Sequence, residues 1–417
     1  MDASGDNCLL KNIDFVYFDA GGGHRAAATA LLTVTERQGR PWRVRLVNLQ
    51  EILDSLDIFR RIMGIRLEDI YNLVLRKGWT LGSAQMLVAM HGIIRLYHRA
   101  QVRLLTEFWR RDTPDMVVSL VPNFNRAMWQ AIQALNPAIP YVTVITDFAD
   151  YPPHFWMERQ EPLLNRRTTD AGPPDSAAFR SAAAASCAPF LVCGTERAVA
   201  QARQMGYRDE RIFLTSGMIL RPGFYDAPEI DVAAERVRLG LRADLPTGLV
   251  LFGGAGSTAM TQIARELDRS AMPLQLIFIC GRNVKLRERL TAMPLRYPRI
   301  VEGFTGEIPY YMRLADFFIG KPGPGSISEA LAMKLPVVVV SNAWTLPQER
   351  YNAEWVREKQ VGAVLRSFGE IERGIAELLE PAQFARFRAN AAAVQNRAVF
   401  EIPRILEKIV ANHSSTQ

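Results

Sequence analysis

The sequence predicts an α/β protein built from two Rossmann-like domains that face each other across a cleft. At 417 residues the chain exceeds the usual size of a single hydrophobic core. Each half also opens in the same way, with an apolar run, a glycine-rich loop and a helical stretch. Short strands that alternate with helices are typical of a parallel sheet with helices on both faces, so two such sheets are expected.

The first half begins with an apolar strand at 13–18, a glycine cluster and an alanine-rich helix at 25–35. Further short apolar runs, separated by helical or turn segments, are typical of buried strands. They lie at 44–49, 116–120, 141–145 and 190–193. The stretch 158–188 contains strong helix and strand breakers without any period, so we expect a flexible surface insertion there.

The second half repeats this order, with a strand at 248–252, a glycine loop at 253–256 and a helix at 258–267. Later strands are expected at 276–280, 317–320 and 337–340, with a helix at 327–333. The Pro- and Gly-containing stretch 216–228 is the expected boundary. The predicted domains are therefore 1–220 and 221–395, and the helical pattern in the final segment, 396–417, is expected to pack back on the N-terminal domain.

Composition indicates a globular protein, with 48% hydrophobic and 22% charged residues. The N-terminus has no basic region followed by an apolar run, and no segment is apolar over the ~18 residues that a membrane span needs. Cytoplasmic location is therefore expected. The four cysteines, Cys8, Cys187, Cys193 and Cys280, fit neither a zinc site nor a disulfide framework and are interpreted as buried thiols.

The positive charge is concentrated in one segment, 60–111, which has ten Lys or Arg against three acids and so accounts for the formal net charge of +7. Arg95, Arg99 and Arg103 recur every four residues and share one helix face. An apolar stripe is expected beside them, at Met86, Met90, Ile93, Tyr97, Leu104 and Phe108. A basic amphipathic helix favours attachment to an anionic membrane surface, although an ordinary core helix with a solvated face has the same pattern. Nucleic-acid binding is not expected, because no stacking motif accompanies the charge.

Three glycine-containing turns follow predicted strands. In the first, Asp19 precedes Gly21, Gly22 and Gly23, and His24 opens the helix. Backbone amides at a helix N-terminus accept polar or anionic ligands, and a histidine there is either a titratable group facing substrate or a cap of its own helix.

The second turn contains Gly253, Gly254 and Ser257, whose amides and hydroxyl suit a diphosphate. It matches neither GxGxxG nor a P-loop, which disfavours a NAD-dependent oxidoreductase and an ATPase. In the third turn, Gly325 and Ser326 precede Glu329, a carboxylate that can accept both hydrogens of a ribose diol or simply stabilise the helix dipole.

Polar residues also cluster at Gln348, Glu349 and Asn352, where Gln348 and Asn352 are expected to share a helix face. Such a mixed set of donors and acceptors suits sugar hydroxyls, although alone it is usually a solvated face.

Together these segments resemble the monogalactosyl- and diglucosyl-diacylglycerol synthases, relatives of the MurG-type UDP-GlcNAc transferase with the GT-B fold. The matching segments occur in the family's order and span most of residues 13–365. They read DAGGGHRAAATAL, VTVITDF, ICGRN, EGFTGEIPYYMRLADFFIGKPGPGSISEALAMKLPVVVV and QERYNA. The chain departs from the family at Ala20, where Thr is usual, in the glycine content of GGAGST, and in the insertion at 158–188.

The resemblance implies a role for each matching position. His24 corresponds to the catalytic histidine that deprotonates the acceptor hydroxyl, and Asp19 to the acid before the acceptor loop. The implied donor-binding residues are Gly253, Gly254 and Ser257 for the diphosphate, Gly325 and Ser326 for phosphate, Glu329 for ribose, Arg282 and Phe304 for the base, and Gln348, Glu349 and Asn352 for the sugar.

The predicted function is an inverting glycosyltransferase that moves a hexose from UDP-galactose or UDP-glucose to a lipid, with diacylglycerol the expected acceptor. No Asp-x-Asp pair is present to bind a metal-diphosphate, so neither metal nor cofactor is expected. Peripheral attachment to the inner face of the membrane is expected from the basic segment. The alternatives are a UDP-sugar epimerase of the same fold, which needs no acceptor, and a non-catalytic nucleotide-sugar or lipid-binding protein.

Overall fold

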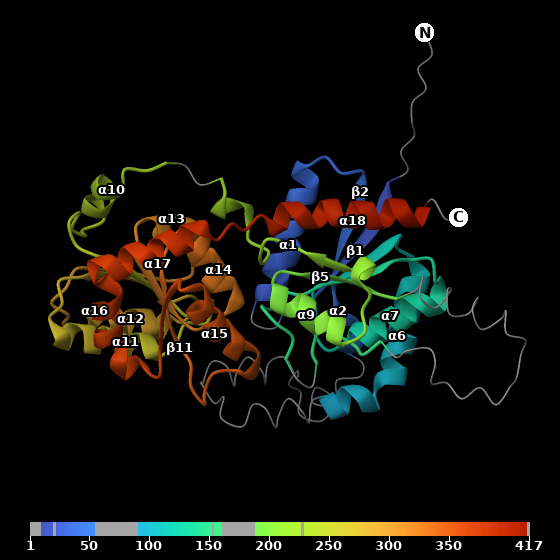
Figure 1. Ribbon diagram of the computed structural model, residues 1–417, viewed down its shortest axis with the longest axis horizontal. Helices are drawn as coiled ribbons and strands as arrows, with labels where there is room; N and C mark the ends of the chain where they lie inside the picture. Colours follow the sequence, from blue (N-terminus) through green and yellow to red (C-terminus); the bar gives the residue numbers. More distant parts are fainter. Residues whose placement is uncertain are drawn as a thin grey trace, which may run out of the picture.

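The computed structural model describes residues 10–19, 22–54, 91–151, 154–160, 188–226 and 229–414. These residues form two lobes that lie side by side, each built on one six-stranded sheet whose neighbouring strands are all parallel (Figure 1). The strand orders are β2-β1-β3-β4-β5-β6 and β12-β11-β10-β7-β8-β9. The predicted pair of Rossmann-like units is confirmed.

The N-terminal sheet consists of β1 (Lys11–Tyr17), β2 (Trp42–Asn48), β3 (Met116–Ser119), β4 (Tyr141–Val144), β5 (Phe190–Cys193) and β6 (Ile212–Leu214). The last of these was not predicted, because β6 is a short edge strand with an exposed Leu214. The strand predicted at 44–49 ends one residue early. Asn48 accepts a hydrogen bond from the backbone N–H of Gln50 and thereby starts the short helix α2 (Leu49–Leu53).

Helices cover both faces of this sheet. On one face α1 (Gly23–Arg37) packs its alanines and Leu31 against β1 and β3. On the other face lie α2, α6 (His98–Arg111), α7 (Asn125–Leu135) and, against β5, α9 (Glu196–Gln204). The strands are buried on both faces, which explains why they are continuous apolar runs in the sequence.

The C-terminal sheet consists of β7 (Thr247–Leu251), β8 (Gln275–Ile279), β9 (Arg299–Glu302), β10 (Phe317–Gly320), β11 (Val337–Val340) and β12 (Gly362–Leu365). Its helices are α10 (Val232–Arg238), α11 (Ala259–Ser270), α12 (Val284–Ala292), α13 (Ile308–Arg313), α14 (Pro324–Ala332), α15 (Arg350–Lys359), α16 (Ile371–Leu379) and α17 (Pro381–Ala393). The unpredicted strands β9 and β12 are the two edges of the sheet.

The last helix, α18 (Ala398–Ser414), leaves the C-terminal lobe and lies along the N-terminal lobe beside α1 (Figure 1). Its apolar residues Ile402, Leu406 and Ile409 are buried together with α1 and the sheet. Arg40, which follows α1, forms an ion pair with Glu407 of α18. The chain therefore crosses between the two lobes twice; the described residues of the first crossing are 216–226 and 229–231, and those of the second are 394–397.

The basic segment differs in part from its prediction. Residues 60–90, with Met86 and Met90, lie outside the described residues. Arg95 lies in a helical stretch that ends before Tyr97, the residue that precedes α6, and Arg95, Arg99 and Arg103 are all exposed. The predicted apolar stripe is displaced by one position.

Leu104 and Phe108, which were expected in that stripe, are only half-buried. The fully buried residues of α6 are Leu105 and Trp109, because the helix packs that face on α2 and the sheet. None of the described helices combines the length and the apolar character that crossing a membrane requires. Most of the predicted insertion at 158–188, together with Cys8 and Cys187, lies outside the described residues, whereas Cys193 and Cys280 are buried free thiols as predicted.

Candidate active site

The carboxyl ends of the strands in both sheets carry the candidate site residues, both predicted and unpredicted. The loop with His24 follows β1, and Thr146 and Asp147 follow β4. In the C-terminal lobe the loop 253–257 follows β7, and Lys321 follows β10. In open parallel sheets, ligands bind in the crevice outside the carboxyl ends of the strands. The site therefore lies between the lobes.

His24 is the second residue of α1 and is half-buried. Its Nδ1 lies 3.3 Å from the hydroxyl oxygen of Thr146, its ring also hydrogen-bonds the backbone of Leu120, and the ring centroid lies 5.9 Å from that of Trp156. Neither Thr146 nor Leu120 belongs to α1, so these contacts favour a ring that faces the site over the alternative of a histidine that caps its own helix. Burial lowers the pKa of His24 to about 4. The ring is therefore neutral near pH 7 and able to accept a proton.

Asp19 forms an ion pair with Arg25, with 2.6 Å between the carboxylate and guanidinium groups. This pair spans the acceptor loop, of which Gly22 and Gly23 are described and exposed, while Ala20 and Gly21 lie outside the described residues. Gly22 has φ of 78°, and a Cβ at Gly22 or Gly23 would meet no atom within 4 Å. The described part of the loop, Gly22 and Gly23, is thus open to an approaching ligand, and the Asp19–Arg25 ion pair joins the residues that flank the loop.

The predicted diphosphate loop is interlocked with the turn after β8. Gly254 accepts a hydrogen bond from the backbone N–H of Arg282 at 2.8 Å. At Gly281, where φ is 60°, a Cβ would lie 2.3 Å from the carbonyl oxygen of Gly254, so only glycine fits. Gly253 is left-handed as well, with φ of 73°. The Ser257 hydroxyl accepts a hydrogen bond from the N–H of Ala259 and so also supports the start of α11.

Phe304 and Arg282 form a platform beside this loop. The guanidinium carbon of Arg282 lies 4.1 Å from the ring centroid of Phe304, and Phe304 is 61% exposed. An exposed aromatic ring at the rim of a nucleotide site is suited to stack on a base. Both residues were predicted to hold the base, and the structure brings them together.

The start of α14 presents the third turn. Pro324 is its first residue, Gly325 is exposed and Ser326 is half-buried. The backbone N–H groups of the first helical turn have no partner within the helix. They point beyond the N-terminus of α14, which lies near the carboxyl end of β10. Glu329 lies on the next turn. Burial raises the pKa of the Glu329 carboxyl to about 7, and the positive charge of Arg221 partly offsets this.

The Gln348 to Asn352 cluster is built differently from its prediction. Residues Pro347–Glu349 form a 3-10 turn, and α15 begins at Arg350, so Gln348 and Asn352 do not share one α-helical face. Glu349 is 7% exposed and pairs with the Lys321 ammonium at 2.6 Å. Asn352 is fully buried, and its Nδ2 donates to the Pro322 carbonyl at 2.8 Å. Asn352 Nδ2 therefore supports the 321–323 loop, its Oδ1 has no hydrogen-bond partner among the described residues, and its contact with the sugar stays a prediction.

Four residues that contact the predicted site residues or one another were not predicted, namely Thr146, Asp147, Trp156 and Lys321. Trp156 Nε1 donates to Asp147 Oδ2 at 2.8 Å. Burial raises the pKa of Asp147 to about 7, with further raising effects from the charges of Glu349 and Asp150 and an opposing effect from Lys321. The available signal was the polar pair Thr146-Asp147 directly after a buried strand.

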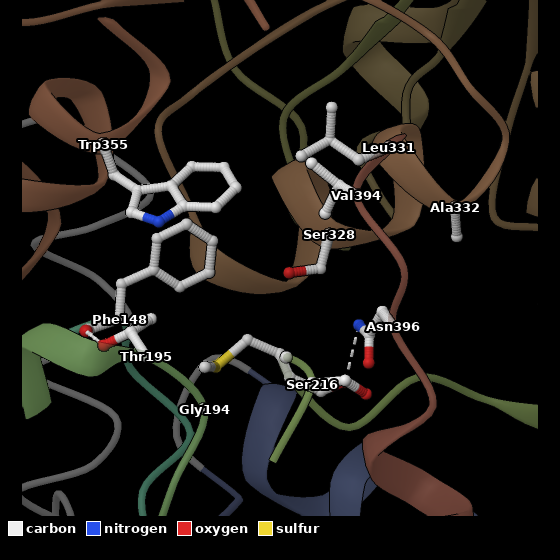
Figure 2. Close-up of a pocket in the computed structure, with 12 residues that line it drawn as sticks. Phe148, Gly194, Thr195, Ser216, Ser328, Leu331, Ala332, Trp355, Val394 and Asn396 are labelled. Carbon is white, nitrogen blue, oxygen red and sulfur yellow. Dashed lines mark hydrogen bonds between the residues drawn. The ribbon is translucent and has the colours of Figure 1, made fainter. Parts of the chain in front are cut away.

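An apolar seam joins the two lobes next to this site. Phe148 of the N-terminal lobe meets Trp355 of α15 edge-on, with ring centroids 4.8 Å apart. Figure 2 shows both side chains on the wall of a small cavity of about 50 Å³, with Leu331 from α14 and Asn396 from the second crossing. Asn396 Nδ2 donates to the Met218 carbonyl at 2.9 Å and ties the two crossings together.

Comparisons with known proteins identify the class. Residues 249–405 match the glycosyltransferase family 28 C-terminal domain. Among solved structures, MurG of Acinetobacter baumannii has a TM-score of 0.58 at 15% identity and covers 95% of this chain and 99% of its own. CalG4, the calicheamicin glycosyltransferase, has a TM-score of 0.55 at 16% identity and covers 96% and 98%. The fold is therefore GT-B, that of the glycosyltransferases to which MurG and CalG4 belong.

Full-length relatives are also similar. The probable monogalactosyldiacylglycerol synthase 2, chloroplastic, of Oryza sativa subsp. japonica is 27% identical over 430 residues, which cover 96% of this chain and 81% of the relative. Monogalactosyldiacylglycerol synthase 1, chloroplastic, of Arabidopsis thaliana is 25% identical, with 97% of this chain and 72% of the relative covered. The protein is a glycosyltransferase: its C-terminal region matches the family 28 C-terminal domain, and the chain is similar to monogalactosyldiacylglycerol synthases over nearly its whole length.

Proposed function

We propose that this glycosyltransferase moves a hexose from UDP-galactose or UDP-glucose to the free hydroxyl of a lipid, diacylglycerol, with inversion at the anomeric carbon. The observation that carries the proposal is the placement of a neutral His24 at the mouth of an open loop on one side of the cleft. The predicted donor loops lie at the strand ends of the other lobe. The names of the full-length relatives support the lipid acceptor.

In the proposed mechanism His24 acts as the general base. A ring nitrogen of His24 takes the proton of the acceptor hydroxyl while the oxygen attacks the anomeric carbon and UDP leaves from the opposite side. The contacts to Thr146 and Leu120 orient the ring. General-base assistance of this kind typically contributes 10² to 10⁴ in rate.

The donor site would hold the UDP-sugar by its three parts. Phe304 and Arg282 stack on the base, and Glu329 accepts the ribose hydroxyl hydrogens. The amides of 253–257 and of the first turn of α14 stabilise the negative charge that develops on the departing diphosphate. Gln348 and Glu349 contact the sugar. The helix ends and amides supply this stabilisation without a metal ion, which is the basis for proposing a metal-independent transferase without a cofactor.

Arg95, Arg99 and Arg103 are proposed to attach the protein to the anionic inner face of a membrane. All three are exposed, and Leu96 beside them is 78% exposed, so the helical stretch offers both charge and apolar surface.

The test of transfer uses purified protein, diacylglycerol micelles and each of UDP-galactose, UDP-glucose and UDP-GlcNAc, without added metal. A glycolipid product is expected with at least one donor. His24→Ala should lower kcat by 10²-fold or more, whereas His413→Ala, at the far end of α18, should leave it unchanged. A His24→Ala enzyme of normal activity would refute the role of His24.

The same assay separates the epimerase alternative, which the solved structure of a UDP-N-acetylglucosamine 2-epimerase keeps open because it shares the fold at a TM-score of 0.53 and 14% identity. Conversion of the UDP-sugar to its epimer without any lipid product would favour the epimerase. Tight binding of UDP-sugar with neither reaction would favour a non-catalytic binding protein.

Attachment is measured by flotation with vesicles that contain anionic phospholipid. At about 1 kcal/mol for each basic residue at the surface, Arg99→Gln with Arg103→Gln should weaken binding roughly 30-fold. The matched control, Arg386→Gln with Arg388→Gln on α17, changes the net charge equally and should bind as the unmodified protein does. Equal binding by both double variants, or binding that does not respond to salt, would contradict the proposed membrane surface.

A further inference from the structure

Asp147 follows β4 at the carboxyl end of the N-terminal sheet and is joined to His24 through two neighbours. Trp156 places its ring against His24 and donates its Nε1–H to Asp147 Oδ2 at 2.8 Å. Thr146, the residue before Asp147, reaches His24 Nδ1 through its hydroxyl. The carboxyl group is therefore fixed close to the position at which the acceptor oxygen reacts.

The opposite wall places the Lys321–Glu349 pair within electrostatic reach of the same carboxyl. The charge of Glu349 raises the pKa of Asp147, and the charge of Lys321 lowers it. Both residues belong to the C-terminal lobe and adjoin Gln348, a proposed sugar contact. Asp147 thus lies between the proposed general base and the proposed donor-sugar site.

Buried hydrogen bonds hold Trp156 in place, and through its Nε1–H they orient Asp147. Asp150 is buried, and its Oδ1 accepts the backbone N–H groups of Phe155 at 2.8 Å and Trp156 at 3.0 Å. Asn125 Nδ2 donates to the Trp156 carbonyl at 3.2 Å. Trp156 itself is only 1% exposed.

One oxygen of Asp147 remains available for a ligand. Trp156 occupies Oδ2, and no hydrogen bond to Oδ1 is present among the residues that the structure describes. The side chain is partly exposed rather than sealed in the core. A preorganised carboxylate oxygen on a partly exposed side chain is suited to accept a hydrogen bond from a hydroxyl group.

We propose that Asp147 is a specificity-determining residue for the sugar donor, and that its free carboxylate oxygen binds one hydroxyl of the transferred hexose from the wall opposite Glu349. The inference rests on the proposed function. Diacylglycerol has a single hydroxyl, which is assigned to His24. The hexose, in contrast, carries several hydroxyl groups that can bind to Asp147. The two lobes then hold the hexose between them.

The test compares kcat/KM for UDP-galactose, UDP-glucose and the monodeoxy analogues of the better donor. Asp147→Asn keeps an oxygen that can accept the hydrogen bond of Trp156 and removes the charge. It should lower kcat/KM for the full donor by about 10- to 100-fold. With the unmodified enzyme, one deoxy donor should have a kcat/KM that is lower than that of the full donor by a similar factor. With that deoxy donor, Asp147→Asn should lower kcat/KM little further, because the contact that it removes is already missing.

Two measurements separate this role from a structural one. The affinity for UDP, which lacks the hexose, should be the same in Asp147→Asn and the unmodified enzyme, and Asp209→Asn on the surface should behave as the unmodified enzyme throughout. If Asp147→Asn does not fold, Trp156→Phe provides the second variant. It releases the anchored oxygen but keeps an aromatic ring beside His24, and it should reduce the discrimination against the same deoxy donor.

Two results would overturn the inference about Asp147 while leaving the proposed function in place. One is that Asp147→Asn lowers kcat/KM by the same factor for every deoxy donor, and the other is that it does not lower kcat/KM at all. An unmodified enzyme that transfers hexose from no donor would instead refute the proposed function itself.

Discussion

Ribose binding by Glu329 should make nucleoside affinity dependent on pH in the neutral range. The pKa of Glu329 is raised to about 7 because burial disfavours its charged form, with Arg221 partly opposing the effect. A carboxyl group of that pKa is about 90% ionised at pH 8 and about 10% ionised at pH 6. Only the ionised form accepts hydrogens from both ribose hydroxyls through two free oxygens.

The affinity should therefore fall as the pH decreases. If only the ionised form binds well, the change between pH 8 and pH 6 is about tenfold in Kd, which corresponds to about 1.4 kcal/mol. Uridine is the appropriate ligand for the titration. It carries no phosphate that titrates in this range and no hexose that would reach Asp147, which titrates in the same range because its pKa is also raised to about 7.

The assay is a ligand-observed NMR titration with uridine at pH 6, 7 and 8. Glu329→Gln should bind more weakly at pH 8 and lose the pH dependence. Glu288→Gln, which removes an exposed carboxylate from α12 of the same lobe, is the matched control and should keep the slope of the unmodified protein. A Kd that is constant from pH 6 to pH 8 in the unmodified protein would refute the reasoning, as would an undiminished slope in Glu329→Gln.

Three further changes have expected outcomes. Arg45→Met should lower the free energy of unfolding by about 3–5 kcal/mol in urea titrations. The reason is that Asp14 is 2% exposed and accepts two hydrogen bonds from Arg45 at 2.6 and 2.8 Å. An unchanged urea midpoint would contradict this. Gly281→Ala should abolish UDP binding, measured by calorimetry, because its Cβ would lie 2.3 Å from the Gly254 carbonyl oxygen; normal affinity would show that the loop can shift. Phe304→Ala should cost about 1–3 kcal/mol of UDP affinity if the ring stacks on the base, and a loss confined to thermal stability would assign the ring a structural role.

The central strands were predictable because strands buried on both faces are continuous apolar runs. The runs at 141–145 and 317–320 coincide with β4 and β10 to within a residue. The missed strands are sheet edges with weaker patterns. All four residues of β9 are half-buried, and β6 ends in an exposed leucine. An edge strand packs less of its surface, so its sequence is less constrained to be apolar.

The candidate site was predictable only where its chemistry is local in the sequence. His24 and the three glycine turns are each contained in a few residues after a strand. The Asp147–Trp156 contact depends on a loop folded around Asp150, and the Lys321–Glu349 contact joins residues from different strand ends. The shared helix face of Gln348 and Asn352 was predicted wrongly, because Pro347–Glu349 form a 3-10 turn and α15 begins only at Arg350.

The return of α18 to the N-terminal lobe has a consequence for the biosynthesis of the protein. Domains generally fold in the order in which the ribosome releases them, and here the C-terminal sheet is entirely encoded between residues 247 and 365. The core of the N-terminal lobe, in contrast, needs Ile402, Leu406 and Ile409 from the last helix. The lobe that is synthesised first is therefore completed last, after the C-terminal lobe has already emerged. Until then the apolar face beside α1 that these three residues cover is without its final packing partner.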